Sequence, residues 1–197
     1  VIMDGAVVQE PDPSRILLFQ HPTLIPWLTV LENVEFGCVI RKERKNYRER
    51  SLFYLERFGL ADKRDLYPSE LSVGMAHRVC IARGLMADPA LLLLDEPFRS
   101  LDTKNSLILM DELVAVWQEK RFTVVFVTHN IEEAVLLGSR IVMLGGCPTG
   151  IIDSIPVDLP YPRQINDPFL LAYKHRFFDL ADIEYRQETP DEDESPA

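Results

Sequence analysis

The sequence of 197 residues predicts an α/β fold with a mainly parallel sheet. Three apolar runs, at residues 91–94, 123–128 and 141–144, have the length of strands, and helical patterns separate them. Strands that alternate with helices in this way form parallel sheets through right-handed crossovers. Residues 41–86 carry a mostly helical pattern, which predicts a helical lobe inserted into the α/β core.

The N-terminal part is expected to add a further short strand. Residues 16–19 are apolar and lead into Gln20, and residues 21–37 are predicted to form a loop and a short helix. Pro22 and Pro26 fix the backbone ahead of Trp27. Residues 1–5 are typical of a strand end and a turn rather than of a natural start, so we expect the chain to be cut from something longer.

Two helices are predicted within residues 41–86. The first has one apolar face and Gly59 as its C-terminal cap, because glycine readily adopts the left-handed conformation found there. The second begins after Ser72, whose hydroxyl can cap it, and ends before Asp88 and Pro89. The apolar face of the first helix consists of Leu52, Tyr54, Leu55 and Phe58.

The four leucines at residues 91–94 are typical of a strand that is buried on both faces beneath helices. Asp95 and Glu96 follow at its carboxyl end, the edge at which open α/β sheets bind ligands. Asp95 is therefore placed to hold Mg²⁺, and Glu96 to orient or deprotonate a water molecule. A strand end with two solvated acids is the alternative interpretation.

The elements after this strand repeat the alternation. Residues 103–120 predict an amphipathic helix, and residues 123–128 predict a strand that delivers His129 to the same carboxyl edge. Asn130 is expected to cap a short helix that ends at Gly138, before the strand at residues 141–144. The apolar face of the long helix is predicted to consist of Leu107, Met110, Leu113, Val114 and Trp117.

Composition narrows the class of protein. A hydrophobic content of 47% fits a globular chain, and no apolar run approaches the roughly 18 residues of a membrane span, so we expect a soluble or peripheral protein. Three widely spaced cysteines predict free thiols rather than a zinc site. Half of the net charge of −10 lies in residues 184–197, which are expected to be a disordered tail. The basic stretch at residues 41–50 is interpreted as an exposed helix face, because the rest of the chain is acidic.

The polar signals at these strand and helix ends resemble, in their order, those of the ATP-binding cassette (ABC) family, the ATPase subunits of transporters. The resemblance runs from residue 1 to about residue 150. It rests on Leu18-Phe19-Gln20, Leu71-Ser72-Val73-Gly74-Met75, Leu91 to Pro97, Ser100-Leu101-Asp102 and Val127-Thr128-His129. It implies a RecA-like P-loop NTPase core in two pieces, residues 1–40 and 89–160, with an inserted α-helical subdomain at residues 41–88 and a C-terminal extension at residues 161–197.

The resemblance also implies a site for ATP and Mg²⁺. Asp95 would hold Mg²⁺ through water, and Glu96 would be the general base or water-orienting carboxylate. His129 matches the switch histidine, which contacts the γ-phosphate. Gln20 matches the Q-loop glutamine, which touches Mg²⁺ or the attacking water, although an ordinary loop glutamine is an alternative interpretation.

Three further residues match motifs that serve the opposing subunit of a dimer. Ser72 and Gly74 match the family signature, where a helix N-terminus binds the γ-phosphate held by the other subunit. Asp102 matches the D-loop, which crosses the dimer interface. A local explanation also exists, because Ser72 and Asp102 can be the N-caps of the helices that follow them.

Within the family, several stretches resemble the importers of nitrate, sulfonate, taurine and related small anions. They are Gln20-His21-Pro22 to Val30, Glu32-Asn33-Val34, Asp95 to Phe98 and Pro160 to Arg163, and importers of cations and pyrimidines share them. The resemblance implies ATP hydrolysis that drives a membrane permease, a head-to-tail homodimer at the cytoplasmic face of the membrane, an external substrate-binding protein as an indirect partner, and no nucleic acid. A non-catalytic interaction module and a soluble, non-transport ABC ATPase are the alternatives.

The sequence departs from the family at the phosphate-binding loop, G-x-x-x-x-G-K-[ST]. None of its nine glycines is followed by lysine, so we expect the loop, with its strand and helix, to be lost from the N-terminus. Such a loss would leave the sheet incomplete between residues 123–128 and 141–144, expose apolar surface, destabilise the isolated chain and weaken ATP binding. Smaller departures are Val73, Ala76, His77, Arg99 and Asn130.

Overall fold

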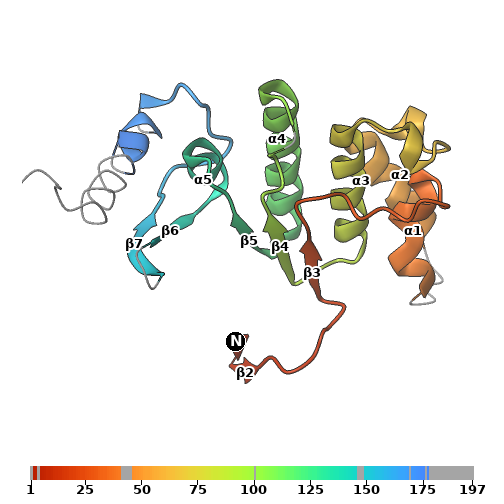
Figure 1. Cartoon of the computed structure of the whole chain (residues 1–197), viewed down its shortest axis with the longest axis horizontal. Coiled ribbons are helices and arrows are strands. Elements are labelled where there is room, and N and C mark those ends of the chain that lie inside the picture. The colour runs from red at the N-terminus through yellow and green to blue at the C-terminus, as the bar shows by residue number, and fades with distance from the viewer. Residues whose placement is uncertain are drawn as a thin grey trace, which may run out of the picture. The chain divides into compact units, whose positions relative to one another are not determined.

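The computed structural model describes residues 2–3, 5–40, 46–99, 101–145, 149–168, 170–175 and 177. The chain divides into two compact units, residues 1–127 and residues 128–197, which are described one at a time (Figure 1). The expectations for the acidic tail, for Cys147 and for the basic residues 41–45 fall outside the described residues.

The first unit is built on a three-stranded parallel sheet. Its strands are β3 (Arg15–Leu18), β4 (Leu91–Asp95) and β5 (Thr123–Val127), in that spatial order. Leu93 of β4 pairs in register with Leu17 on one side and Val125 on the other. The α/β class and the parallel sheet predicted from the sequence are confirmed.

The two faces of this sheet are buried to different degrees. Leu92 and Leu94 are 0% and 2% exposed, whereas Leu91 and Leu93, which point to the opposite face, are only half-buried. The three strands lie side by side in chain order. Right-handed crossovers therefore place the helices of both connections on the same face of the sheet. The prediction that the leucine strand is buried on both faces is therefore wrong, because within the described residues only one face is well covered.

Helix α3 (Val73–Met86) packs on the covered face. A Cβ atom at Gly84 would lie 3.3 Å from the side chains of Ile16 and Leu18, so α3 contacts β3 closely. Helices α1 (Val30–Ile40) and α2 (Tyr47–Arg57) pack against α3 and against each other. Together they form a helical lobe that also includes α1, which lies before the predicted residues 41–88. Its fully buried side chains include Val30, Val34, Tyr54, Leu55 and Leu85.

The predicted caps of this lobe are present. The Ser72 hydroxyl accepts the Met75 N–H at 3.3 Å at the start of α3. Gly59 follows the end of α2 with φ 66°, a left-handed conformation that glycine adopts without strain. Two short 3₁₀ turns, η1 (Ala61–Lys63) and η2 (Pro68–Glu70), connect α2 to α3.

Helix α4 (Thr103–Lys120) has the predicted bounds, but its buried face is rotated from the predicted one. Met110 and Leu113 are buried as predicted, but the predicted Leu107, Val114 and Trp117 are only half-buried. Leu109 and Val116, each 1% exposed, complete the buried face. Trp117 lies beside the end of the helix, where its indole N–H donates to the Phe122 carbonyl at 2.9 Å. Although α4 has 18 residues, neither it nor another helix in the described part of the chain is long and apolar enough to cross a membrane.

The second unit contains α5 (Ile131–Leu137) and an antiparallel pair, β6 (Arg140–Gly145) and β7 (Gly150–Pro156). Asn130 caps α5 and Gly138 ends it, as predicted. The expectation that the third apolar run extends the parallel sheet is wrong, because among the described residues β6 pairs only with β7. A short connection between neighbouring strands favours an antiparallel hairpin, and the sequence pattern gave no signal for β7.

Arg163 is buried in the second unit, with 8% of its surface exposed, and bonds to several backbone carbonyls there. Its guanidinium donates to the carbonyls of Val135 at 2.6 Å and Gly138 at 2.7 Å, at the end of α5. It also donates to the Val157 carbonyl at 3.1 Å, just after β7. A buried arginine saturated with carbonyl groups thus ties the helix to the hairpin.

The N-terminal residues form a separate small hairpin of β1 (Ile2–Met3) and β2 (Ala6–Val7), which belongs to the first unit. Gly5 lies at the turn with φ 79°. The predicted strand end and turn at residues 1–5 are confirmed for the described residues.

Candidate active site

Gln20 and Glu96 meet at the carboxyl edge of the parallel sheet. Gln20 is the second residue after β3, and Glu96 is the first after β4. The Gln20 side-chain Nε2 donates to Glu96 Oε2 at 3.3 Å. Because β3 and β4 are parallel, both strands end at this edge, which is where α/β sheets bind ligands. The structure thus brings together two of the residues that the sequence predicted to share a site.

The backbone of Glu96 has a strained conformation. Its φ is 42°, in the left-handed region that residues other than glycine rarely adopt. Its N–H donates to the Val127 carbonyl of β5 at 3.0 Å, and its side chain is 20% exposed. Strain of this kind, held by the surrounding strands, is concentrated at functional positions.

Arg99 forms an ion pair with Glu96. The distance between Arg99 Nη1 and Glu96 Oε2 is 2.7 Å. The sequence identified Arg99 only as a departure from the family pattern and missed this contact. The signal was present, because a basic residue three positions after an acid can return to it across a tight turn.

Asp95 is exposed at the last position of β4. Mg²⁺ prefers hard oxygen ligands and keeps several waters, so the Asp95 carboxylate and the Gln20 amide oxygen fit as part of its ligand set. In the part of the chain that the structure describes, no group of three or more His, Cys, Asp or Glu side chains could hold a metal ion. These residues therefore suit a Mg²⁺ that takes its other ligands from phosphate and water.

The same residues do not supply a cradle for the phosphates of ATP. Such a cradle needs the backbone N–H groups of a glycine-rich loop and the lysine that follows them. No glycine in the sequence is directly followed by a lysine. The residues predicted to hold Mg²⁺ and water are therefore present without a glycine-rich loop and its lysine.

Ser72 and Gly74 lie in the first turn of α3, next to the segment that leads into Asp102. A Cβ atom at Gly74 would lie 2.8 Å from Leu101 Cδ2, so the absence of a side chain lets the two segments approach. Val73, which stands where the family has glycine, is 54% exposed and points into solvent. The structure thus brings the predicted signature segment and the predicted D-loop together.

Asp102 is the N-cap of α4, as the local interpretation predicts. Its Oδ1 accepts the Asn105 N–H at 3.0 Å, and its other oxygen accepts from the Asn105 side chain. These bonds, from the Asn105 side chain and then its backbone, lower the pKa of Asp102. Arg78 of α3 donates to the Asn105 side chain, so Asn105, which the sequence analysis missed, links the start of α4 to α3.

His77 is buried beneath the site, with 4% of its surface exposed. Burial is the main cause that lowers its pKa, nearby His21 lowers it further, and a hydrogen bond with the Pro97 backbone opposes the shift. Its Nε2 has no hydrogen-bond partner among the described residues. The sequence identified His77 only as a departure, but this side chain bonds to the backbone of Pro97, which follows Glu96, and His21, which follows Gln20, influences its charge.

His129 belongs to the second unit and is exposed. Its loop is ordered locally, because the Thr128 hydroxyl accepts the Asn130 N–H at 3.0 Å and the Asn130 side chain accepts the Glu132 N–H at 2.9 Å. Its catalytic role stays a prediction.

The chain is similar to known ATP-binding proteins. The family model described as ABC transporter matches residues 6–99. An uncharacterized ABC transporter ATP-binding protein of Methanocaldococcus jannaschii is 41% identical over 181 residues, which is 91% of this chain and 68% of the relative. An aliphatic sulfonates import ATP-binding protein of Bacillus licheniformis is 39% identical, over 89% of this chain and 68% of the relative. A nitrate import ATP-binding protein of Synechococcus elongatus is 43% identical, over 83% of this chain and 26% of the relative.

Solved structures agree with these relatives. A dimeric ATP-binding cassette in a post-hydrolysis state, bound to ADP and Pi, has a TM-score of 0.61 and 32% identity, over 71% of this chain and 66% of that one. A second dimeric cassette structure has a TM-score of 0.59 and 38% identity, over 66% of this chain and 58% of that one. Several relatives are matched over only 63% of their length. The identity, the coverage and the RecA-like P-loop fold together show that this chain belongs to the ABC family of transporter ATPases.

Proposed function

We propose that the chain is part of an ATP-hydrolysing subunit that energises the import of a small anion of the nitrate, sulfonate or taurine type. The observation that carries the proposal is the contact between Gln20 and Glu96 at the sheet edge. The names of the nitrate and aliphatic sulfonate relatives support the class of substrate.

In this proposal the residues at the edge of the sheet divide the work. Glu96 orients or deprotonates the attacking water, and Gln20 fixes the Glu96 carboxylate and reports the state of the nucleotide. Asp95 and Gln20 would hold Mg²⁺, which supplies charge stabilisation for the transferring phosphoryl group. His129 would contact the γ-phosphate, as the resemblance to the family implies.

We further propose that two copies pair head to tail. Ser72, Gly74 and Asp102 then serve the ATP of the opposing subunit. The exposed N-terminus of α3 supports this role, because its backbone N–H groups favour an anion. The dimeric cassettes among the similar structures are in line with such an assembly.

The phosphate-binding loop is proposed to lie outside these 197 residues. Titration of Mg²⁺-ATP into the chain, followed by calorimetry, should then give a Kd weaker than about 1 mM. Micromolar binding would show that the chain forms a complete nucleotide site by other means.

A gain-of-function experiment tests the catalytic proposal directly. The chain joined to the phosphate-loop segment of the Methanocaldococcus jannaschii relative should bind and hydrolyse ATP. The Glu96→Gln variant of this fusion should keep ATP binding and lose about 100-fold in kcat, because the water-activating carboxylate is gone. Equal loss of binding and kcat would contradict the role given to Glu96.

The proposed partner is a membrane permease at the cytoplasmic face of the membrane, with an external substrate-binding protein as an indirect partner. Co-purification of a permease from detergent-solubilised membranes would support the importer. Recovery of the chain with no membrane protein, under conditions in which a relative's complex survives, would favour the alternative of a soluble ABC ATPase.

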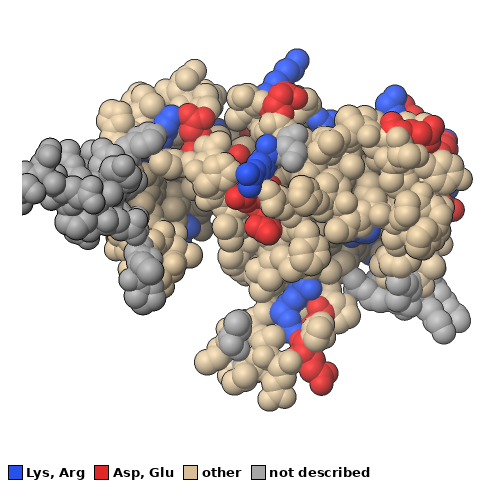
Figure 2. All heavy atoms as spheres, in the orientation of Figure 1, with Lys and Arg blue, Asp and Glu red and all other residues tan. Residues whose placement is uncertain are grey.

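Two alternative functions fit the chain to different degrees. A non-catalytic interaction module fits the missing phosphate loop, and it would pair with a permease or an ATPase without turnover in the fusion. A soluble ATPase acting on nucleic acid fits poorly, because on the face in Figure 2 basic side chains lie close to acidic ones without a broad basic patch. The net charge of −10 points the same way.

A further inference from the structure

The turn after β4 directs Arg99 back to Glu96. The Arg99 N–H donates to the Glu96 carbonyl at 3.3 Å, which closes a four-residue turn. Pro97 and Phe98, in the middle of the turn, are both buried, and Phe98 is only 1% exposed. Because its centre is anchored in the core, the turn holds the two side chains within reach of each other.

Glu96 Oε2 accepts hydrogen bonds from two side chains, and the two bonds differ in length. Arg99 Nη1 lies 2.7 Å from Oε2, at the distance of a charge-assisted hydrogen bond, whereas Gln20 Nε2 lies at 3.3 Å from it. A glutamate side chain has several rotatable bonds, so a short, charge-assisted contact restricts it more than a long neutral one. Of these two contacts, the one from Arg99 therefore does more to orient the carboxylate.

We propose that Arg99 is a positioning residue that holds the Glu96 carboxylate in the orientation it needs to activate water. The inference rests on the proposed ATPase function, and it gives a role to a residue that departs from the family pattern. Arg99 does not itself touch the reacting atoms. Its side chain is 55% exposed, so water screens the pair and its effect on the rate is modest.

An ordinary surface ion pair is the competing explanation, and the chain offers a matched example. Arg64 and Asp65 form a contact at 3.3 Å between Nε and Oδ2 in the helical lobe, and the Arg64 side chain is 53% exposed. This pair lies outside the residues assigned to the site. Arg64→Ala is therefore the control for removing a half-exposed, paired arginine.

The first test uses the chain itself and needs no ATP hydrolysis. In NMR spectra, Arg99→Ala should shift the Glu96 carboxyl carbon and the Gln20 side-chain amide, and Arg99→Lys should shift them less. Arg64→Ala should leave both signals in place. Unmoved signals in Arg99→Ala, or equal shifts in Arg64→Ala, would overturn the inference.

The second test measures catalysis in the ATP-hydrolysing fusion. Arg99→Ala should lower kcat about threefold to tenfold at unchanged KM for ATP and unchanged melting temperature, and Arg99→Lys should restore most of the rate. An unchanged kcat, or a change in KM alone, would refute the positioning role. If the unmodified fusion hydrolyses no ATP, the proposed function fails, while the NMR test still decides whether Arg99 orients Glu96.

Discussion

The two faces of the three-stranded sheet differ more than the strand sequences suggest. On the covered face, Leu18, Leu92 and Leu94 are 9%, 0% and 2% exposed. On the opposite face, Leu17 and Val125 are 47% and 52% exposed, although they pair in register with Leu93. Phe19 and Val127 extend this open face at 57% and 61%. An apolar composition on both faces therefore does not mean burial on both faces.

The difference follows from the order of the strands. Because β3, β4 and β5 advance in one direction across the sheet, right-handed connections place α3 and α4 on the same side. The other side keeps strongly apolar residues, and within the described residues of the first unit no helix follows a connection to that side. An apolar face of this kind favours association or a further covering segment. The expected exposure of apolar surface is thus confirmed, and low stability of the isolated chain stays a prediction.

The largest expected effect on stability comes from a cavity on the covered face of the sheet. Leu92→Ala should lower the free energy of unfolding by about 2–5 kcal/mol, because it leaves a cavity where Leu92 is fully buried. Leu17→Ala, one strand away on the open face, is the matched control and should cost about 1 kcal/mol or less. Urea denaturation followed by circular dichroism measures both. Equal losses would mean that the open face is covered in solution.

A smaller effect is expected from a titratable group on the covered side. The pKa of His77 is lowered from 6.5, so the folded chain binds its proton less readily than the unfolded chain. Stability is therefore fully present above pH 6.5 and is lost as the pH falls towards the lowered pKa, by at most about 1.4 kcal/mol per pH unit.

The control for this prediction is His77→Gln, which keeps a polar side chain but cannot titrate. Its unfolding free energy should vary less between pH 6.5 and pH 5 than that of the original chain. His21 is the titratable neighbour that faces His77, so the double variant His21→Gln, His77→Gln separates their contributions. If the unfolding free energy of both variants still depends on pH as in the original chain, other titratable groups cause this dependence.

The smallest effect on stability is expected on the open face. Val125→Thr and Val127→Thr, made together, should change the unfolding free energy by about 0.5 kcal/mol or less. They should nevertheless reduce concentration-dependent association, because they interrupt the exposed apolar surface. Sedimentation velocity over a concentration series measures this directly. Association that is unchanged would place the contact surface elsewhere.

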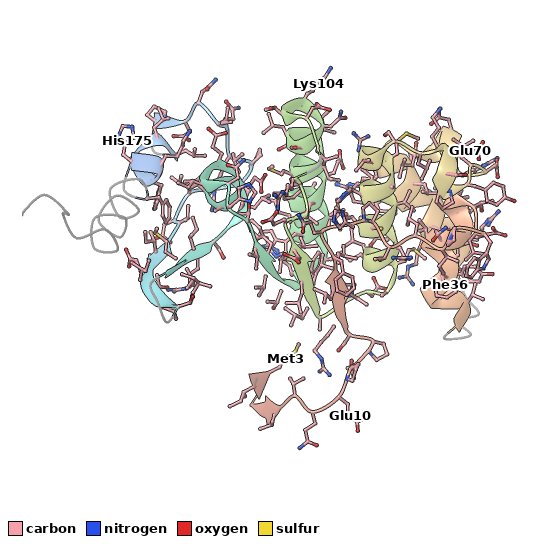
Figure 3. The ribbon with its side chains drawn as sticks, viewed as in Figure 1. Met3, Glu10, Phe36, Glu70, Lys104 and His175 are labelled. Atoms are coloured by element: carbon pink, nitrogen blue, oxygen red, sulfur yellow. The ribbon has the colours of Figure 1, made fainter. Side chains whose placement is uncertain are left out.

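Local signals predicted several helix ends well. The bounds of α4 matched the periodicity, and Ser72, Asp102 and Asn130 cap helices as their side-chain chemistry indicates. Lys104, labelled in Figure 3, lies in the first turn of α4, two residues after the Asp102 cap. The rotated buried face of α4 was missed, because periodicity shows that a face exists but not which neighbours it meets.

The candidate site was predicted in part. The residue types and their position at a strand end were sufficient to propose Asp95 and Glu96, because open α/β sheets bind ligands at this edge. Gln20 was proposed only from the resemblance to the ABC family. The pairing of Arg99 with Glu96 and the link from Arg78 through Asn105 to Asp102 depend on turn geometry and helix packing. The spacing of three residues permits the contact between Glu96 and Arg99, but the turn and the helix packing decide whether these contacts form.

The sequence by itself determined where the capped helices begin and which acids follow the leucine strand, because caps and periodicity act over a few residues. Only the tertiary structure decided which face of the sheet is covered, that β6 pairs with β7, and that Arg99 reaches Glu96. These outcomes depend on strand order and on contacts between segments far apart in the chain, which are settled by burying apolar surface over the whole unit.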